Sequence, residues 1–162
     1  MNKISLLLII LTIFSNCTQQ GNDEQALQSK VDSLQAKLDR AYKPGLGEFM
    51  TGIQIHHEKL WFAGQYENWG LANFEVNEIK EAVDDIKQYC SDRPEVKSID
   101  MIESAIDSVH RAIQLKNVNS FKSSFILLTN TCNNCHQATK HEFNVIKIPD
   151  SPPFSNQEFK AR

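Results

Sequence analysis

The chain has 162 residues, of which 41% are apolar, which is enough for one globular domain with extensions but not for two independent cores. Its formal net charge is −3. No stripe of basic residues runs along it, so we expect neither nucleic acid nor an anionic lipid surface as a charge-driven partner.

The first predicted element is an export signal over residues 1–16. Lys3 precedes an apolar run that ends at Phe14, and this run is too short to span a bilayer. Cys17 follows at the position where the cysteine of a bacterial lipoprotein becomes lipidated. We therefore expect Cys17 to anchor the exported chain to a bacterial membrane, on the periplasmic side or at the cell surface. A simple secretory signal without lipid is the alternative.

The next predicted elements are a tether and a short helix. Residues 17–25 are polar and contain Gly21, a composition typical of a flexible tether. Residues 26–43 have apolar positions spaced four and three apart, at Leu27, Val31, Leu34, Leu38 and Ala41. Two heptads leave two alternatives open, a helix packed on its own domain or self-association into a homodimer. Pro44 and Gly45 end this helix.

Four further amphipathic helices are predicted within residues 46–143, because apolar residues recur there every three or four positions. They cover about residues 47–63, 68–90, 98–116 and 120–143. Asn68 and Ser98 are the expected N-caps of the second and third. No window alternates with the period of two that a strand requires. The predicted fold class is all-α, an antiparallel four-helix bundle with the extra N-terminal helix.

The segment 144–162 follows the last predicted helix. It contains Pro149, Pro152 and Pro153, so we expect irregular backbone over its length. Two alternatives remain for this tail, which either straps across the bundle or hangs free.

The residues Cys132, Asn133, Asn134, Cys135 and His136 form the pattern C-x-x-C-H late in the last predicted helix. This pattern is the attachment site of a c-type haem, whose vinyl groups bond both thiols while the adjacent histidine ligates the iron. We expect one covalent haem c on Cys132 and Cys135, with His136 as the proximal iron ligand. Zinc binding is disfavoured because no second cysteine pair is present, and a thioredoxin-like role because no strand precedes the motif.

The motif leaves the sixth iron ligand open. Met50 and His57 lie on one face of the first bundle helix, about 10 Å apart by helical rise, so only one can reach the iron. Met50 is alternatively a pocket side chain or core filler, and His57 a hydrogen-bonded core residue. Trp61 and Phe125 are further pocket candidates, although aromatic residues at helical spacing are core by default.

Four other residues are expected to stay outside the site. His56 is rotated by about 100° from its neighbour along the helix, so we expect it to be solvated. Cys90 falls on the apolar stripe and is predicted to be buried and inert. His110 and His141 occupy exposed or terminal positions and indicate no function.

The late position of the motif resembles the cytochrome c-prime group, the class II c-type cytochromes, which are four-helix bundles. In that family a residue of the first helix, often methionine, lies over the distal haem face, before the helix ends in small residues. Met50 with Ala63 and Gly64 is similar to that arrangement, and the resemblance covers roughly residues 46–143. The N-terminal lipoprotein segment, the histidine pair and the proline-containing tail depart from the family pattern.

The predicted function is single-electron transfer by a membrane-anchored haem protein, with a redox partner that the sequence does not name. The resemblance implies an alternative, a five-coordinate haem that binds nitric oxide or carbon monoxide, and it allows a homodimer. A second alternative is a structural lipoprotein whose cysteines carry no haem. We expect no enzyme, because no carboxylate pair, nucleophile with base or phosphate loop is identifiable from spacing.

Overall fold

The structure is a computed structural model that describes residues 23–41 and 44–161. Its contacts divide the chain into two units, residues 1–43 and 44–162. Within the described ranges the regular elements are all helical and no strand occurs, so the all-α prediction is confirmed. None of the described helices is long and apolar enough to cross a membrane. The predicted export signal and Cys17 lie outside the described residues.

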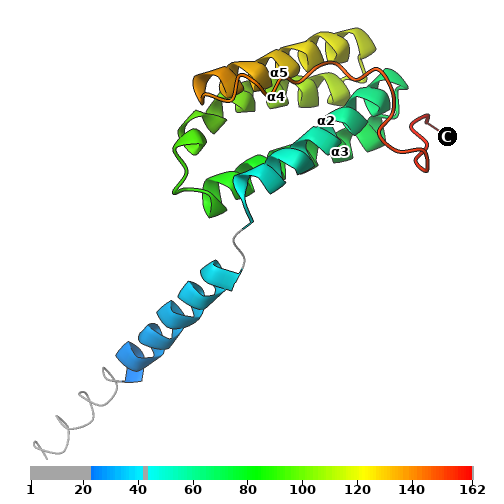
Figure 1. Cartoon of the computed structure of the whole chain (residues 1–162). Coiled ribbons are helices and arrows are strands. Elements are labelled where there is room, and N and C mark those ends of the chain that lie inside the picture. Colours follow the sequence, from blue (N-terminus) through cyan, green and yellow to red (C-terminus); the bar gives the residue numbers. More distant parts are fainter. Residues whose placement is uncertain (1–22, 42–43, 162) are drawn as a thin grey trace, which may run out of the picture. The chain divides into compact units, whose positions relative to one another are not determined.

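The described part of the first unit is a single helix over residues 23–41 (Figure 1). Residues 23–25, which were expected in the tether, already belong to it. Side-chain amides bond carboxylates one turn later in two places, Gln28 to Asp32 and Gln35 to Asp39. The predicted stripe forms but is exposed, by 63, 51, 64 and 62% at Leu27, Val31, Leu34 and Leu38.

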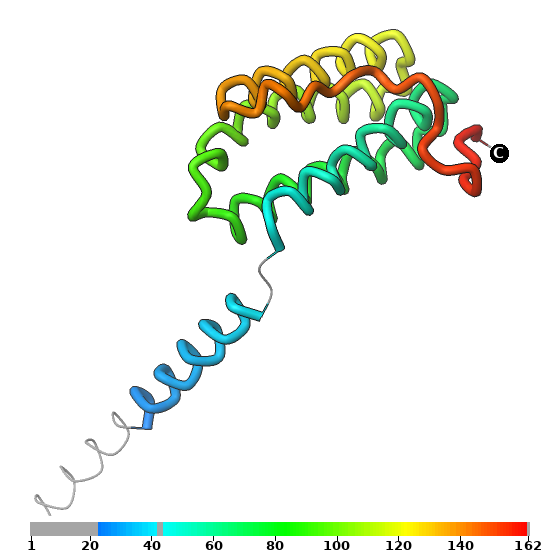
Figure 2. Tube along the Cα trace, in the orientation of Figure 1, coloured from blue at the N-terminus to red at the C-terminus, as the bar shows by residue number. Residues whose placement is uncertain are grey.

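The second unit opens with two long helices, α2 (Leu46–Gln65) and α3 (Trp69–Tyr89), which lie side by side in Figures 1 and 2. The N-cap predicted at Asn68 is confirmed, because its side-chain oxygen accepts a hydrogen bond from the amide of Leu71 at 3.2 Å. This bond satisfies one of the amides that the first turn of α3 leaves without a helical partner.

The N-cap predicted at Ser98 is wrong. A 3₁₀ helix, η1 (Pro94–Ile102), occupies that stretch, and helix α4 (Glu103–Gln114) follows it directly. Pro94 stands at the start of η1, where a missing amide hydrogen costs no helical bond. The side chain of Ser98 therefore lies inside a helical segment instead of at its start.

Helix α5 (Val118–Ala138) carries the C-x-x-C-H motif. Its N-cap is Asn117, whose side chain accepts from the amide of Ser120 at 2.9 Å, so the helix begins within the break expected at residues 117–119. It also ends at Ala138 instead of near residue 143. Lys140 takes a positive φ of 62°, and amides 140 and 141 bond back to the carbonyls of 137 and 136, which closes the helix in a Schellman motif.

The helices of the second unit enclose one apolar core. Helix α2 contacts α3 and α5, and α4 contacts α3 and α5, while η1 packs on α3, α4 and α5. The largest side chains with less than 2% exposure include Leu60, Ile79, Ile86, Phe121, Phe125 and Leu128. Helices α2 and α5 approach closely at Gly64, where an added Cβ would lie 2.2 Å from the Phe121 ring. Only glycine fits this contact.

Residues 144–161 form what we call the C-terminal strap. The strap runs back alongside α5 and then turns away from it (Figure 2). Ile148 packs against the core, and Phe159 is buried with its ring 5.9 Å from that of Phe62 on α2. Of the two alternatives for the tail, the strapped one is the arrangement present over these residues.

Candidate functional site

The motif occupies the last turns of α5, where Cys132, Cys135 and His136 are all half-buried. Burial raises the pKa of the Cys132 thiol to about 12, with a smaller contribution from Cys135, and burial also raises the pKa of Cys135. Both cysteines are free, and the Cys135 thiol points toward the carbonyl of Ser98 at 3.6 Å. They are protonated thiols and lack the lowered pKa of redox-active cysteines.

Two cavities of about 180 and 290 Å³ border the motif. The residues that line both cavities are Gly47, Met50, Ile99, Cys135, His136 and Asn144. The smaller cavity also has Cys132, His57 and the apolar side chains of Ile53, Ile102 and Ile146 in its wall. Protein interiors are normally close-packed, so the hollow beside both thiols and the histidine is the candidate binding site of this unit.

His136 has a defined proton arrangement. Its Nδ1 lies 2.6 Å from the backbone carbonyl oxygen of Asn144. Because a carbonyl only accepts, Nδ1 carries the proton and donates it, which leaves the lone pair on Nε2. Metal-ligating histidines use this arrangement, in which the second ring nitrogen is held by a carbonyl or carboxylate.

His57 is both a core residue and a cavity residue. It is 4% exposed, its ring lies 4.4 Å from that of Phe125, and it lines the smaller cavity. Its Nε2 lies 2.9 Å from the Thr129 hydroxyl, which donates its own proton to the Phe125 carbonyl at 2.9 Å. The hydroxyl therefore accepts from Nε2–H. Burial lowers the pKa of His57 to about 4, so the ring is neutral with its lone pair on Nδ1.

The other sequence-predicted pocket residues separate into two groups. Met50 is half-buried and lines both cavities, so it lies at the site. Trp61 and Phe125 line neither cavity, and their rings pack 4.9 Å apart in the core. Phe125 reaches the site only through His57. Aromatic residues at helical spacing usually belong to the core, and these two side chains fill the core behind the cavity and are not part of its wall.

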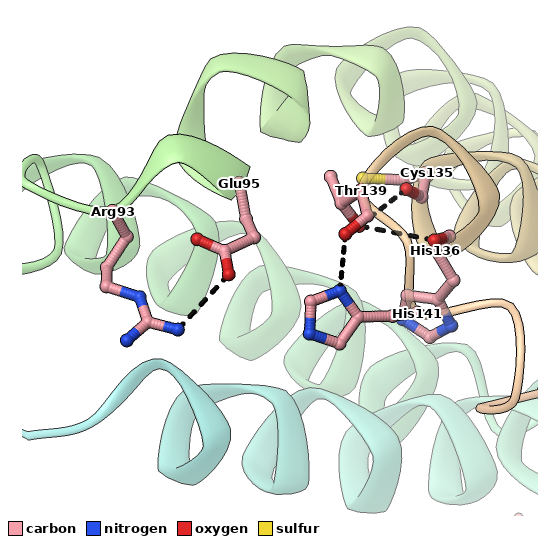
Figure 3. A network of polar contacts seen from close by, with 6 residues as sticks. All are labelled: Arg93, Glu95, Cys135, His136, Thr139 and His141. Carbon is pink, nitrogen blue, oxygen red and sulfur yellow. Dashed lines mark hydrogen bonds and ion pairs between the residues drawn. The ribbon is translucent and has the colours of Figure 1, made fainter.

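A polar group at the larger cavity was not foreseen from the sequence. Figure 3 shows Glu95 of η1 between Arg93, the N-cap of η1, and His141. The His141 ring bonds the Thr139 carbonyl at 2.8 Å. Arg93 pairs with Glu95 at 3.1 Å, and the pKa of Glu95 is lowered by its own backbone amide and then by Arg93. All four residues lie outside the long α-helices, with Thr139 directly after the end of α5, so no helical period in the sequence could bring them together.

His56 is not solvated as expected. Its Nδ1 lies 2.7 Å from a carboxylate oxygen of Glu75, which is 1% exposed between α2 and α3. The Lys59 ammonium lies 4.0 Å from the other oxygen of the same carboxylate. A buried carboxylate requires such polar partners, and they keep His56 at the helix interface. Cys90 is buried as predicted, with 3% exposure.

Comparison of the chain with protein-family models, with curated proteins and with solved structures finds no match. The chemistry of the site is therefore the basis for a function. Its donor set is two thiols three residues apart, a neighbouring imidazole with a free Nε2 lone pair, and a largely apolar hollow beside them. These residues fit a covalently attached haem, whose porphyrin nitrogens would bind the iron together with His136 and leave the sixth ligand open.

Proposed function

We propose that the chain is a c-type cytochrome that carries one haem c on Cys132 and Cys135 and transfers single electrons outside the cytoplasm. One observation carries the proposal: both thiols and His136 border the cavities, and His136 Nδ1 is bonded to a carbonyl at 2.6 Å. The two thiols have the sequence spacing that thioether bonds to the vinyl groups require, and Nε2 would be available to the iron.

We also propose that α2 to α5 form an antiparallel four-helix bundle of the cytochrome c-prime kind. The connections 66–68 and 115–117 have three residues each, which favours antiparallel neighbours within each helix pair. Contacts between α2 and α5 and between α3 and α4 join the two pairs. In such bundles, cofactors lie between facing helices, as the cavities between α2, η1 and α5 do.

A bound haem supplies a one-electron iron couple, and the chain's residues tune it. His136 would ligate the iron. Ile53, Ile99 and Ile102 give the smaller cavity apolar walls, and an apolar surrounding would disfavour the oxidation state of the haem that carries the higher charge. The polar group of Arg93 and Glu95 borders the larger cavity and gives it a charged wall.

The distal ligand decides between electron transfer and gas binding. Met50 offers a thioether at both cavities, and His57 offers a neutral imidazole at one of them. Ligation by either residue would complete the iron's ligand set, which suits electron transfer. The hydrogen bond from His57 to Thr129 holds this ring in the core, which favours Met50 as the ligand. A five-coordinate iron that binds nitric oxide or carbon monoxide is the alternative if neither side chain ligates.

The location belongs to the same proposal. The signal at residues 1–16 and lipidation of Cys17 would place the haem domain at a bacterial membrane, in the periplasm or at the cell surface. The redox partner would then be another protein on that side of the membrane. Attachment of c-type haem outside the bacterial cytoplasm agrees with this location.

The test is an absorption spectrum of the full chain, produced in a bacterium with c-type haem maturation and recorded oxidised and reduced, with and without carbon monoxide. We expect a Soret band and a sharp reduced α band that the gas leaves unchanged. A high-spin spectrum that shifts with the gas would replace electron transfer by gas binding. Absence of a Soret band would overturn the haem proposal and leave a structural lipoprotein.

Covalent attachment is tested by the double variant Cys132→Ser/Cys135→Ser. We expect it to lose all haem that resists acid–acetone extraction, because the motif then has no thiol to form a thioether. Cys90→Ser is the matched control, since this buried cysteine lines neither cavity and its variant should keep the haem. Equal haem content in the double variant and the control would contradict attachment at the motif.

A further inference from the structure

Asn133, the first of the two residues between the motif cysteines, pairs with the C-terminal strap. Its Nδ2 donates to the carbonyl oxygen of Ile146 at 2.8 Å, and its Oδ1 accepts from the amide of Ile146 at 2.8 Å. The side chain thus satisfies both backbone groups of one strap residue, as a neighbouring β-strand would. The neighbouring Asn134 is exposed.

The pairing lies next to the bond that holds His136. Asn144, whose carbonyl accepts from His136 Nδ1 at 2.6 Å, precedes Ile146 by two residues. Three hydrogen bonds therefore join the motif to residues 144–146 of the strap. Both Asn144 and Ile146 also line the smaller cavity, so this part of the strap forms a wall of the site.

Asn133 holds the strap on the C-terminal side of the Asn144 carbonyl. Residues 144–149 belong to no helix, so their backbone has no ladder of bonds to fix it. The amide of Asn144 bonds the carbonyl of His141 at 2.9 Å, which fixes the approach from α5. Beyond it, the Asn133 pair is the next fixed point. Without that pair, the next contact beyond Asn144 is the packing of Ile148 on the core, four residues away, so the position of the Asn144 carbonyl against His136 would loosen.

We propose that Asn133 is a positioning residue for the proximal histidine. It fixes the Asn144 carbonyl against His136 Nδ1, which sets the orientation of the imidazole and its strength as an electron donor. This inference rests on the proposed function, in which His136 ligates the iron. A hydrogen bond from Nδ1–H makes the imidazole a stronger donor, which favours the oxidised iron and lowers the reduction potential.

The experiment compares Asn133→Ala with Asn134→Ala in the haem-loaded full chain. We expect Asn133→Ala to keep its haem and to shift the reduction potential to a more positive value in a spectroelectrochemical titration. The amide of Ile146 should exchange its hydrogen about tenfold faster, because its acceptor is lost. Asn134→Ala is matched in residue type and position, and it should leave the potential and the exchange rate at their wild-type values.

A reduction potential of Asn133→Ala equal to that of Asn134→Ala would overturn the inference, even with faster exchange at Ile146. The hydrogen bonds of Asn133 would then hold the strap without affecting the iron. If Asn133→Ala carries no haem, Asn133→Ser replaces it, since serine stays polar but cannot make both bonds. The same positive shift is required of it. A wild-type chain without haem would instead defeat the proposed function. Hydrogen exchange at Ile146 would still measure how firmly Asn133 holds the strap.

Discussion

Helices α2 and α5 are packed differently at their two ends. At one end, Gly64 of α2 lies against the Phe121 ring of α5, and the Trp61 ring stacks 6.3 Å from the same ring. At the other end, Met50 and His136 border two cavities of about 180 and 290 Å³. One pair of helices thus combines a close-packed end with a hollow one.

The difference follows from the side chains that each end presents. Toward the motif, the α2 residues in the wall of the smaller cavity include Gly47 and Thr51 beside the larger Met50 and Ile53. Helix α5 contributes two cysteines and His136 to this wall, and no aromatic carbocyclic ring of the described residues borders it. Toward the other end, α2 and α5 present large aromatic rings, which fill the space between helices. The close packing of rings is therefore concentrated at the aromatic end, while the motif end keeps two cavities.

The largest expected effect comes from breaking the close-packed end. Phe121→Ala removes a fully buried ring and should lower the free energy of unfolding by about 3–5 kcal/mol in urea unfolding. Met50→Ala should cost clearly less, because this half-buried side chain already borders a cavity. Equal losses in the two variants would show that the two ends do not differ in packing.

The next effect comes from His57, which lies at the boundary of the two ends, against Phe125 and the smaller cavity. Burial lowers its pKa from 6.5 to about 4, so the folded state holds it neutral while the unfolded state protonates it below pH 6.5. The stability that depends on the neutral His57 is fully present above pH 6.5. As the pH falls to 4, the free energy of unfolding drops by about 3 kcal/mol in total.

Urea unfolding between pH 7 and 4 measures this loss in the haem-free Cys132→Ser/Cys135→Ser chain, where no iron competes for the ring. The same chain with His57→Gln has no group to titrate at this position. Over this range, we expect the free energy of unfolding of the His57→Gln chain to fall by about 3 kcal/mol less than that of the chain with His57. Parallel pH profiles for the two chains would contradict a neutral buried His57.

The smallest effect sharpens the comparison within α2 alone. Gly64→Ala places a Cβ 2.2 Å from the Phe121 ring and should destabilise the fold by about 1–3 kcal/mol, since the close-packed end cannot yield. In Gly52→Ala the added Cβ has no atom within 4 Å, and alanine should stabilise the fold by up to about 1 kcal/mol because it favours the helix more than glycine does. Thermal unfolding of both variants checks the opposite signs, and a shared sign would contradict the difference.

The helices were predictable from the sequence, but several of their ends were not. Apolar periodicity located α2, α3 and α5, and the side-chain cap at Asn68 is a local signal. Helices α2, α4 and α5 all end beside residues with positive φ, and these are Glu67, Lys116 and Lys140. No glycine marks these ends, so the usual C-cap signal was missing. For the same reason, α5 was predicted to be too long.

The candidate site divides in the same way. Its donors Cys132, Cys135 and His136 are adjacent in sequence, so one helical turn and the motif spacing were enough to identify them. Nothing local pointed to Glu75 as the partner of His56, because the two residues lie 19 positions apart on different helices. Such a pair forms only when two helices pack together.

The sequence by itself determined the all-α class and the motif, because helical period and i to i+3 spacing depend on neighbours in the chain. Only the tertiary structure decided that Asn144 holds His136, that Asn133 clamps the strap and that Trp61 fills the core. The physical reason is the range of the contacts. Such pairings form between segments whose meeting depends on the packing of the whole unit, for which the local pattern holds no signal.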